Sequence, residues 1–261
     1  MDARSEQVAI SIRGLVVAFG AQTVLDGLSL DVRQGEILGV VGGSGAGKSV
    51  LLRTLIGLVP KRAGSVEFPG LKVDAAAVAP TDHTAVMRHW GILFQQGALF
   101  SSLTVRQNVE FPMRENLALS ARLREELADA KLDMVGLNRR DGEKFPAEIS
   151  GGMTKRAALA RALALDPDIV FLDEPTSGLD PISGEEIDTL IRTLQETLGL
   201  TVFMVTHDLD SLNTICDRIA VLAEGKIVAQ GSMASMLASD HPWVKSYFRG
   251  KRSRAAASAP H

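Results

Sequence analysis

Three short segments of the chain carry residues whose types and spacing suit phosphate chemistry. The first matches the phosphate-binding pattern GxxxxGK[ST] and consists of Gly42, Gly43, Ser44, Gly45, Ala46, Gly47, Lys48 and Ser49. Glycines let the backbone turn its N–H groups around phosphates, and the helix that follows points its positive end at them. We expect Lys48 to reach the β- and γ-phosphates of a nucleotide and Ser49 to coordinate Mg²⁺. Taken alone, the segment is also compatible with an ordinary glycine-rich turn.

The second segment is a pair of carboxylates, Asp173 and Glu174, directly after the apolar residues 169–172. Such a run predicts a buried parallel strand, and α/β sheets hold their ligands at the carboxyl ends of these strands. Asp173 suits Mg²⁺ coordination, and Glu174 suits a general base that polarises an attacking water. A helix cap or a surface ion pair is the alternative for an isolated pair. The phosphate-binding segment upstream favours the catalytic interpretation.

The third segment is 149–153, in which Ser150 precedes Gly151 and Gly152. Ser150 can cap the following helix and leave the two glycine amides at its positive end. That would be a second anion site, and one nucleotide cannot easily use both sites. A head-to-tail dimer, in which each chain's second site completes its partner's first, explains the pair of sites. A plain N-capped helix explains the same residues.

The hydropathy pattern predicts the strands and helices that must position these segments. Strands are expected at 8–17, 28–32 and 36–41, and a helix at 48–58. After a further helix at 150–165, predicted strands at 169–172, 201–205 and 218–222 alternate with helices at 183–198 and 208–215. Between these parts, 104–137 has a helical pattern with Leu119, Leu123 and Leu127 on one face. We therefore expect an α/β core that brackets a mostly helical insertion.

Composition limits the classes of function. The 261 residues suffice for one large α/β domain, and a net charge of −3 argues against a generic nucleic-acid binder. The single Cys216 excludes an internal disulfide framework and suits a reducing cytoplasm. From the mixed charges at the start of the sequence we expect no secretory signal, and no run approaches the ~20 apolar residues of a membrane-spanning helix. We expect any membrane association to depend on another subunit.

With all three segments in this order, the chain resembles the nucleotide-binding subunits of ABC transporters. Residues 149–153 are similar to the LSGGQ signature, with Ile for Leu and Met for Gln. The resemblance implies a P-loop NTPase (RecA-like) α/β core with a β-rich N-terminal part and an inserted α-helical subdomain. The expected division is one domain at 1–240, with core 1–94 and 155–240 and helical subdomain 95–154. A C-terminal helix and basic tail follow at 241–261.

The resemblance also implies an ATPase with ATP and Mg²⁺ as cofactors, and it assigns roles to single residues. Ser150, Gly151 and Gly152 would face the γ-phosphate on the partner chain, and Asp180 belongs to a segment similar to the D-loop between the two sites. His207 matches the switch histidine that contacts the γ-phosphate. Gln95 matches the glutamine that links Mg²⁺ and water to the helical insertion. Phe19 lies where an aromatic residue stacks on adenine, with core packing as the alternative.

Residues 94–105, followed by 108–109 and 111–115, are similar to lipid-transport ATPases of the Mla or MCE type. Val50 after the phosphate-binding serine and Met153 in the signature fit the same group. This implies a peripheral homodimer on the cytoplasmic face of the bacterial inner membrane, with two permease copies, a periplasmic MCE-domain protein and a STAS-domain regulator. The substrate would be phospholipid moving between the inner and outer membranes, which maintains outer-membrane lipid asymmetry.

Other functions remain open from the residues. An amino-acid importer or a lipoprotein exporter would use the same ATPase core, and a soluble ABC ATPase acting on DNA or ribosomes is a third option. A small-molecule P-loop kinase would leave the signature and Asp180 without a role. Near the C-terminus, Trp243, Tyr247 and Phe248 could pack across a dimer, onto a regulator or onto their own domain. The basic residues beyond could approach anionic lipid or remain in solvent.

Overall fold

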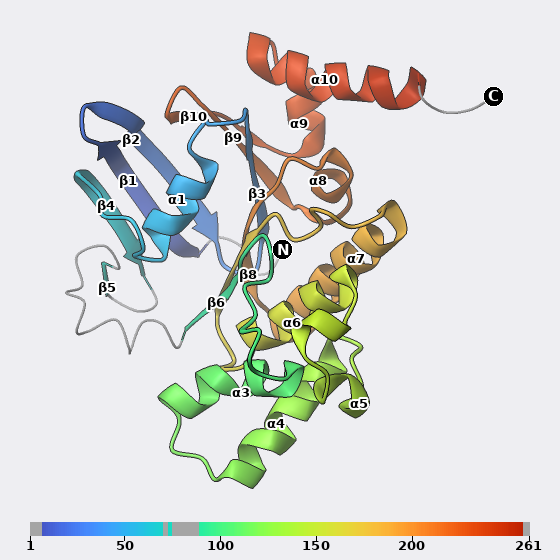
Figure 1. The fold of residues 1–261 in the computed structure, drawn as a ribbon. Helices are drawn as coiled ribbons and strands as arrows, with labels where there is room; N and C mark the ends of the chain where they lie inside the picture. The colour runs from blue at the N-terminus through green and yellow to red at the C-terminus, as the bar shows by residue number, and fades with distance from the viewer. Residues whose placement is uncertain (1–6, 70–72, 75–88, 258–261) are drawn as a thin grey trace.

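The computed structural model describes residues 7–69, 73–74 and 89–257, and two sheets form its frame (Figure 1). The antiparallel sheet has the order β2-β1-β4-β5. Its strands are β1 (Val8–Phe19), β2 (Gln22–Arg33), β4 (Ala63–Phe68) and β5 (Val73–Asp74). β2 is longer than the strand predicted at 28–32, because it pairs with β1 along most of its length.

The central sheet has the order β10-β9-β3-β8-β7-β6 and is parallel except at β10. Its strands are β3 (Ile37–Gly42), β6 (Trp90–Leu93), β7 (Ile169–Asp173), β8 (Thr201–Val205), β9 (Arg218–Ala223) and β10 (Lys226–Gly231). In β8, Phe203 and Val205 face one apolar cluster, whereas Val202 and Met204 face another. Successive side chains of a strand point to opposite faces, so a sheet buried on both faces needs an apolar residue at every position.

Helices cover both faces of this central sheet, which confirms the predicted α/β class. α1 (Lys48–Leu55) packs into the cluster shared with the antiparallel sheet. α6 (Gly151–Ala162) and α7 (Pro181–Leu198) pack into the cluster on the other face. A third cluster joins β9 to α8 (Leu209–Ile215), α9 (Met233–Ala238) and α10 (Pro242–Ala257).

The segment between β6 and α6 is helical and gathers at one end of the molecule (Figure 1). It contains α3 (Val105–Asn116), α4 (Ala121–Met134), α5 (Arg139–Gly142) and the 3₁₀ turn η2 (Pro146–Glu148). The pattern predicted at 104–137 is thus two helices, which are separated where Ser120 caps α4. α6 runs through residue 154 without a break, so the helical part and the core share this helix.

The predicted apolar face of α4 is wrong. Leu123 and Leu127 are 41% and 36% exposed, whereas Ala128 and Leu132 are buried. α4 contacts α3 and α6, and these neighbours select a different side of the helix from the one that leucine spacing suggested. Tertiary contacts therefore overrode a weak sequence pattern here.

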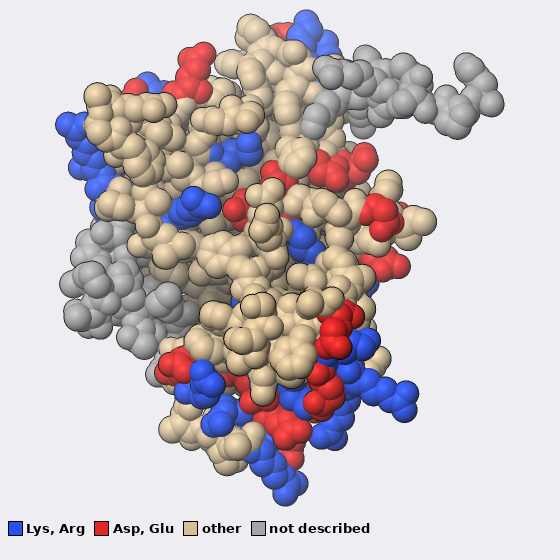
Figure 2. All heavy atoms as spheres, viewed as in Figure 1, with Lys and Arg blue, Asp and Glu red and all other residues tan. Residues whose placement is uncertain are grey.

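Charged residues of both signs intermix over the end of the molecule that holds α4 and α5 (Figure 2). Arg106 lies at the centre of this network, 2.5 Å from Asp129 and 2.6 Å from Glu143. Its guanidinium is largely buried, so these carboxylates supply the partners that a buried charge requires. Among the described residues, no helix is long and apolar enough to cross a bilayer.

Candidate active site

The phosphate loop, which we define as residues 42–49, connects buried strand β3 to helix α1. Position 42 requires a glycine because the backbone of Leu222 lies close to it: a Cβ there would be 2.3 Å from the carbonyl oxygen of Leu222. Gly47 caps α1 with φ 102°, in the left-handed region that side chains disfavour. The Lys48 Nζ donates to the carbonyls of Gly42 and Gly43 at 2.8 and 3.1 Å and so curls back over the loop.

The rest of the loop is exposed to solvent on one side and packs against the apolar core on the other. The exposed residues are Ser44, Gly45 and Ser49. Ala46 and Val50 are partly buried and pack against the apolar cluster below. The loop therefore presents its backbone at the carboxyl end of β3, which is where parallel sheets hold phosphate ligands.

Asp173 and Glu174 lie at the carboxyl end of β7, two strands from the phosphate loop in the sheet order. Burial raises the pKa of Asp173, and the charge of Glu174 raises it further, against the cations Arg53, Lys155 and Lys48. A bound cation would reverse this, because positive charge favours the ionised carboxylate. Positive charge near Asp173 therefore acts against the effect of its burial.

Glu174 has a left-handed backbone, with φ 52°. A non-glycine residue with such a φ is strained, and strain of this kind concentrates at functional sites. The surrounding structure enforces it, since the Glu174 N–H donates to the carbonyl of Val205 at 2.8 Å. The side chain is 12% exposed, and its Oε2 lies 2.7 Å from Nδ1 of His207, which follows β8. The structure therefore brings together the predicted base and the predicted switch histidine.

Lys155 is a candidate site residue that the sequence reasoning missed. It is 5% exposed, and its Nζ donates to the carbonyls of Gln95 and Glu174, the latter at 2.9 Å. Burial lowers the pKa of Lys155, while the charges of Glu174 and Asp173 act in the opposite direction. The available signal was a lysine among small apolar residues of the helix predicted at 150–165, since a lysine that such a helix buries needs partners.

The Q-loop, residues 95–98, is fixed to α6 by a second cation. Arg161 donates to the carbonyls of Ala98 and Gly97, both at 2.6 Å. Gln95 has an exposed side chain and lies shortly after β6, which ends at Leu93. The backbone of the Q-loop is thus held by α6, whereas the Gln95 side chain is left at the surface.

The signature residues lie against the D-loop, residues 177–180, in the same chain. Ser150 caps α6 by accepting from the N–H of Met153 at 3.2 Å. A Cβ on Gly151 would contact Leu179 at 3.4 Å, and one on Gly152 would lie 4.0 Å from Ser183 Cβ.

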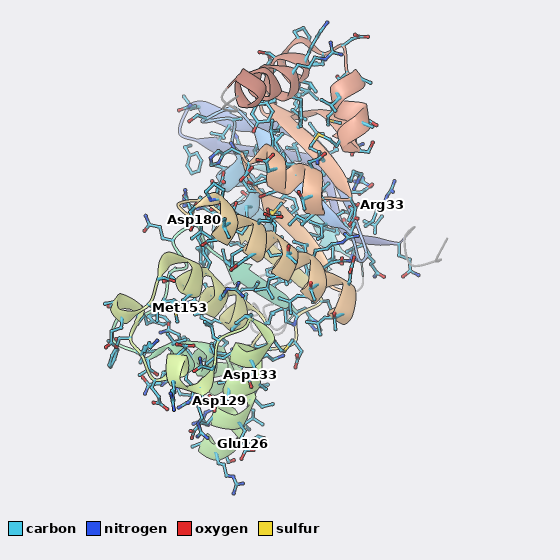
Figure 3. All side chains as sticks on the ribbon, turned by 90° about the vertical axis from the view of Figure 1, so that its right-hand side faces the viewer. Arg33, Glu126, Asp129, Asp133, Met153 and Asp180 are labelled. Atoms are coloured by element: carbon cyan, nitrogen blue, oxygen red, sulfur yellow. The ribbon has the colours of Figure 1, made fainter. Side chains whose placement is uncertain are left out.

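Asp180 caps α7 by accepting from the N–H groups of Ile182 and Ser183, both at 3.1 Å. Hydrogen bonds from Ser183 are the main cause that lowers the pKa of Asp180. In Figure 3, Met153 and Asp180 lie along the same edge of the molecule, whereas Arg33 is on the opposite side. The starts of α6 and α7 thus form one surface.

Phe19 lies at the end of β1 and is 53% exposed. Core packing, the alternative for this residue, is therefore excluded. Its ring faces solvent and is available for stacking.

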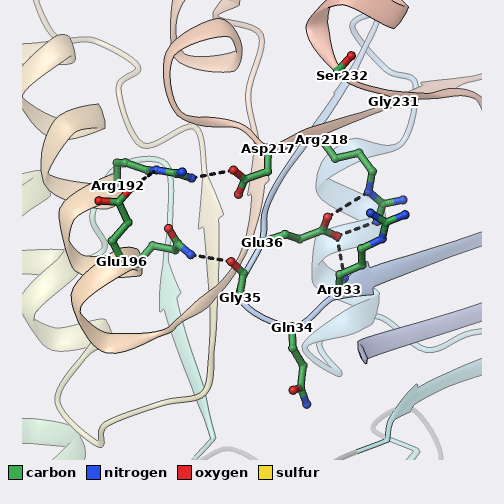
Figure 4. A pocket seen from close by; sticks show the side chains of 11 residues that line it. Arg33, Gln34, Gly35, Glu36, Arg192, Glu196, Asp217, Arg218, Gly231 and Ser232 are labelled. Atoms are coloured by element: carbon green, nitrogen blue, oxygen red, sulfur yellow. Dashed lines mark hydrogen bonds and ion pairs between the residues drawn. The ribbon is translucent and has the colours of Figure 1, made fainter. Parts of the chain in front are cut away.

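A pocket of about 520 Å³ lies elsewhere, among charged side chains beside the start of β3 (Figure 4). Arg192 pairs with Asp217 at 2.9 Å, and Arg218 pairs with Glu36 at 2.7 Å. These ion pairs join α7, β9 and β3 at the amino ends of the parallel strands. None of the predicted site residues lines this pocket, and its position is opposite to the one that α/β sheets use for phosphates.

Residues 25–177 match the family model described as ABC transporter. The chain belongs to the ABC transporter family. The MlaF protein of Haemophilus influenzae, an intermembrane phospholipid transport system ATP-binding protein, is 38% identical over 245 residues, which are 94% of this chain and 92% of that protein. A probable ribonucleotide transport ATP-binding protein of Mycobacterium leprae is 38% identical over 94% of this chain and 70% of its own length. The methionine import ATP-binding protein MetN of Caulobacter vibrioides is 42% identical over 216 residues, which are 83% of this chain and 64% of that protein.

The fold agrees with solved ATP-binding cassettes. A dimeric cassette in a post-hydrolysis state, bound to ADP and Pi, has a TM-score of 0.78 and 31% identity. The match covers 85% of this chain and 98% of that one. The predicted family, fold class and ATPase activity are thereby confirmed.

Proposed function

We propose that this ABC ATPase powers phospholipid transport between the inner and outer membranes of a Gram-negative envelope, through a separate permease. The observation that carries the proposal is the likeness to MlaF over nearly the full length of both chains. The segment that starts at Phe94 supports it, because its sequence is similar to the lipid-transport group.

For the catalytic step we assign Glu174 as the general base and His207 as the residue that positions it against the γ-phosphate. The Oε2–Nδ1 distance of 2.7 Å supports this pairing. Lys48 and the amides of the phosphate loop would bind the phosphates, and Phe19 would stack on adenine. A base held by a neighbouring histidine can polarise a water without large rearrangement.

For Mg²⁺ we assign Ser49, Asp173 and Gln95. Among the described residues, no group of three or more His, Cys, Asp or Glu side chains is arranged so that it could hold a metal ion. Mg²⁺ in nucleotide sites is commonly held by one or two carboxylates together with phosphate oxygens, so a single acid such as Asp173 fits. When bound, the ion would neutralise phosphate charge. The direction of the pKa shift of Asp173 also fits, since burial raises this pKa and a bound cation would favour the ionised form.

We infer that the working unit is a head-to-tail homodimer. Ser150, Gly151 and Gly152 would reach the partner's nucleotide, with Asp180 between the two sites. The shared edge formed by the starts of α6 and α7 supports this inference. We assign residues 1–240 to one cassette domain, with core 1–94 and 155–240 around helical residues 95–154, and residues 241–261 to a C-terminal segment.

An aromatic surface beside the Q-loop is our candidate for the permease contact. Phe100 is 44% exposed, its ring centroid lies 4.7 Å from that of Phe111, and Arg114 lies over the Phe111 ring at 5.1 Å. Exposed aromatic and arginine side chains are enriched at protein interfaces. The proposed complex places this subunit peripherally on the cytoplasmic face of the inner membrane. An MCE-domain protein and a STAS-domain regulator complete it.

The experiment is to purify this chain with its partners from detergent, identify the partner proteins and analyse the organic extract for bound lipid. We expect a permease and phospholipid above the level in a detergent blank. The 42% identity to MetN makes an amino-acid importer the second candidate. Recovery of an amino-acid permease, together with ATPase activity that methionine alters and phospholipid does not, would overturn the lipid assignment.

A further inference from the structure

The C-terminal helix α10 packs on its own chain, next to the catalytic loops. Val244 and Phe248, one helical turn apart, are fully buried against β3, β9, α8 and α9. Arg249 ties α10 to the end of α9 by donating to the carbonyl of Leu237 at 2.9 and 3.2 Å. The sequence left three packing partners open for this segment: a dimer partner, a regulator and the chain's own domain. In the structure the segment packs on its own domain.

The neighbouring stripe of α10, Trp243 and Tyr247, faces two catalytic segments at once. The Tyr247 hydroxyl donates to the carbonyl oxygen of His207 at 3.1 Å. The Trp243 indole lies over the phosphate loop, since a Cβ on Gly43 would be 3.8 Å from its Cζ2 and 3.9 Å from its Nε1. The two rings stack on each other, with centroids 4.8 Å apart and planes 13° from parallel.

This arrangement links the phosphate loop to the loop of His207 through a stack of two aromatic rings. Trp and Tyr are i and i+4 on a helix whose other face is anchored in the core, so their positions relative to each other are constrained. A shift of α10 would move both contacts together. Burial, with the charges of Glu174 and Asp208, raises the pKa of Tyr247 to about 12, so the hydroxyl remains a donor at any working pH.

We propose that Tyr247 is a positioning residue for ATP hydrolysis: it holds the backbone at His207 and is itself held against the phosphate loop by Trp243. Its effect passes through the His207 side chain, which contacts Glu174 at 2.7 Å. Small displacements of a catalytic group cost large factors in rate, so one hydrogen bond to this backbone affects turnover more than binding. The inference rests on ATP hydrolysis and does not depend on which substrate is transported.

The experiment measures steady-state ATP hydrolysis by the purified full-length chain with Tyr247→Phe, which keeps the ring and removes the hydroxyl. We expect kcat to fall about fivefold, as loss of one hydrogen bond implies, while KM for ATP changes less than about twofold. The same substitution in a His207→Ala background should have no further effect on the single-turnover rate, because the side chain being positioned is gone.

Val244→Ala is the matched control for a merely structural role, because Val244 is fully buried and anchors the same helix, whereas the Phe248 ring packs on Tyr247 itself. Val244→Ala should lower the melting temperature at least as much as Tyr247→Phe and leave kcat unchanged. The proposal is overturned if Tyr247→Phe has wild-type kcat, if its loss persists without His207, or if Val244→Ala loses activity in proportion to its melting temperature.

Discussion

At the scale of single residues, Glu174 is fixed from three sides. Its N–H donates to Val205 on the neighbouring strand, its carbonyl accepts from Lys155, and its carboxylate contacts His207. A left-handed non-glycine residue costs on the order of 1–3 kcal/mol, and interactions of this kind offset the cost. The strain directs one carboxylate at the switch histidine, which is consistent with the proposed role as the base.

Glu174→Gln should abolish most hydrolysis while ATP binding persists. A glutamine is isosteric but cannot accept a proton from water, so we expect turnover to fall by a factor on the order of 10²–10⁴. Phosphate release and equilibrium ATP binding measure the two effects. Glu224→Gln is the control, since Glu224 is also left-handed, with φ 51°, and lies in the turn between β9 and β10. Turnover at the wild-type rate in Glu174→Gln would remove this residue as the base.

Lys155→Met should lower kcat by about tenfold or more, because it leaves the carbonyls of Gln95 and Glu174 without this donor. Lys155→Arg should recover part of the rate, since a donor is restored. Lys131→Met is the matched control: Lys131, on α4 of the helical part, is also buried and pairs with Asp166. It should lose stability and keep its ATPase rate. Equal activity of Lys155→Met and wild type would argue that Lys155 only fills space.

At the scale of elements, α6 connects groups that the proposed dimer would place in different active sites. Its first turn carries the capping residue Ser150, and Lys155 and Arg161 further along hold the Q-loop and Glu174. At about 3.6 residues per turn, Ser150 and Lys155 are separated by about 1.4 turns of one helix. A displacement at the signature end would therefore reach the chain's own catalytic loops directly.

Ser150→Ala distinguishes a shared-site signature from a simple helix cap. Loss of a cap costs about 1 kcal/mol of stability whatever its function. Ser120 is a matched cap, accepting from the N–H of Leu123 at 3.3 Å as Ser150 accepts from Met153 at 3.2 Å. We expect both alanine variants to lose similar stability in denaturant titrations, and only Ser150→Ala to lose ATPase activity. Full activity in Ser150→Ala would contradict the head-to-tail dimer.

At the scale of the whole molecule, buried charge makes stability depend on pH. Asp188 on α7 is 5% exposed, and its Oδ1 has no hydrogen-bond partner among the described residues. Burial raises the pKa of Asp188 to about 6, a hydrogen bond from Ser211 opposes this, and the charges of Asp208 and Asp210 add to it. The folded state therefore keeps a proton that the unfolded state loses near pH 4. This contribution to stability is complete below that pH and is lost as the pH rises to 6.

Asp188→Asn should remove this dependence. Because the amide carries no charge at any pH, we expect the variant to gain about 1–2 kcal/mol relative to wild type at pH 7.5, after allowance for solvent screening. The gain should shrink toward zero at pH 4. Chemical denaturation at the two pH values measures it. A gain that is the same at both would show that titration of Asp188 is not its cause.

The sequence alone determined the parts of the molecule that depend on contiguous residues. Three such parts are the phosphate loop, the carboxylates after an apolar strand and the capped signature helix. Each could be predicted from one short segment, because the residue preferences of strands, turns and helix caps are local. Composition and strand–helix alternation were enough to predict the α/β class. Helix ends were less exact, and the helix predicted at 48–58 ends at Leu55.

Only the tertiary structure decided which distant residues meet. Lys155 contacts a carbonyl 60 positions away, and the Tyr247 hydroxyl reaches one 40 positions away. The exposure of Leu123 and Leu127 depended on the neighbours of α4. The position of α10 was open in the sequence, because an apolar stripe on a helix specifies burial without specifying the surface that covers it. Packing of the whole chain selects that surface, and here it brings α10 to the catalytic loops of its own domain.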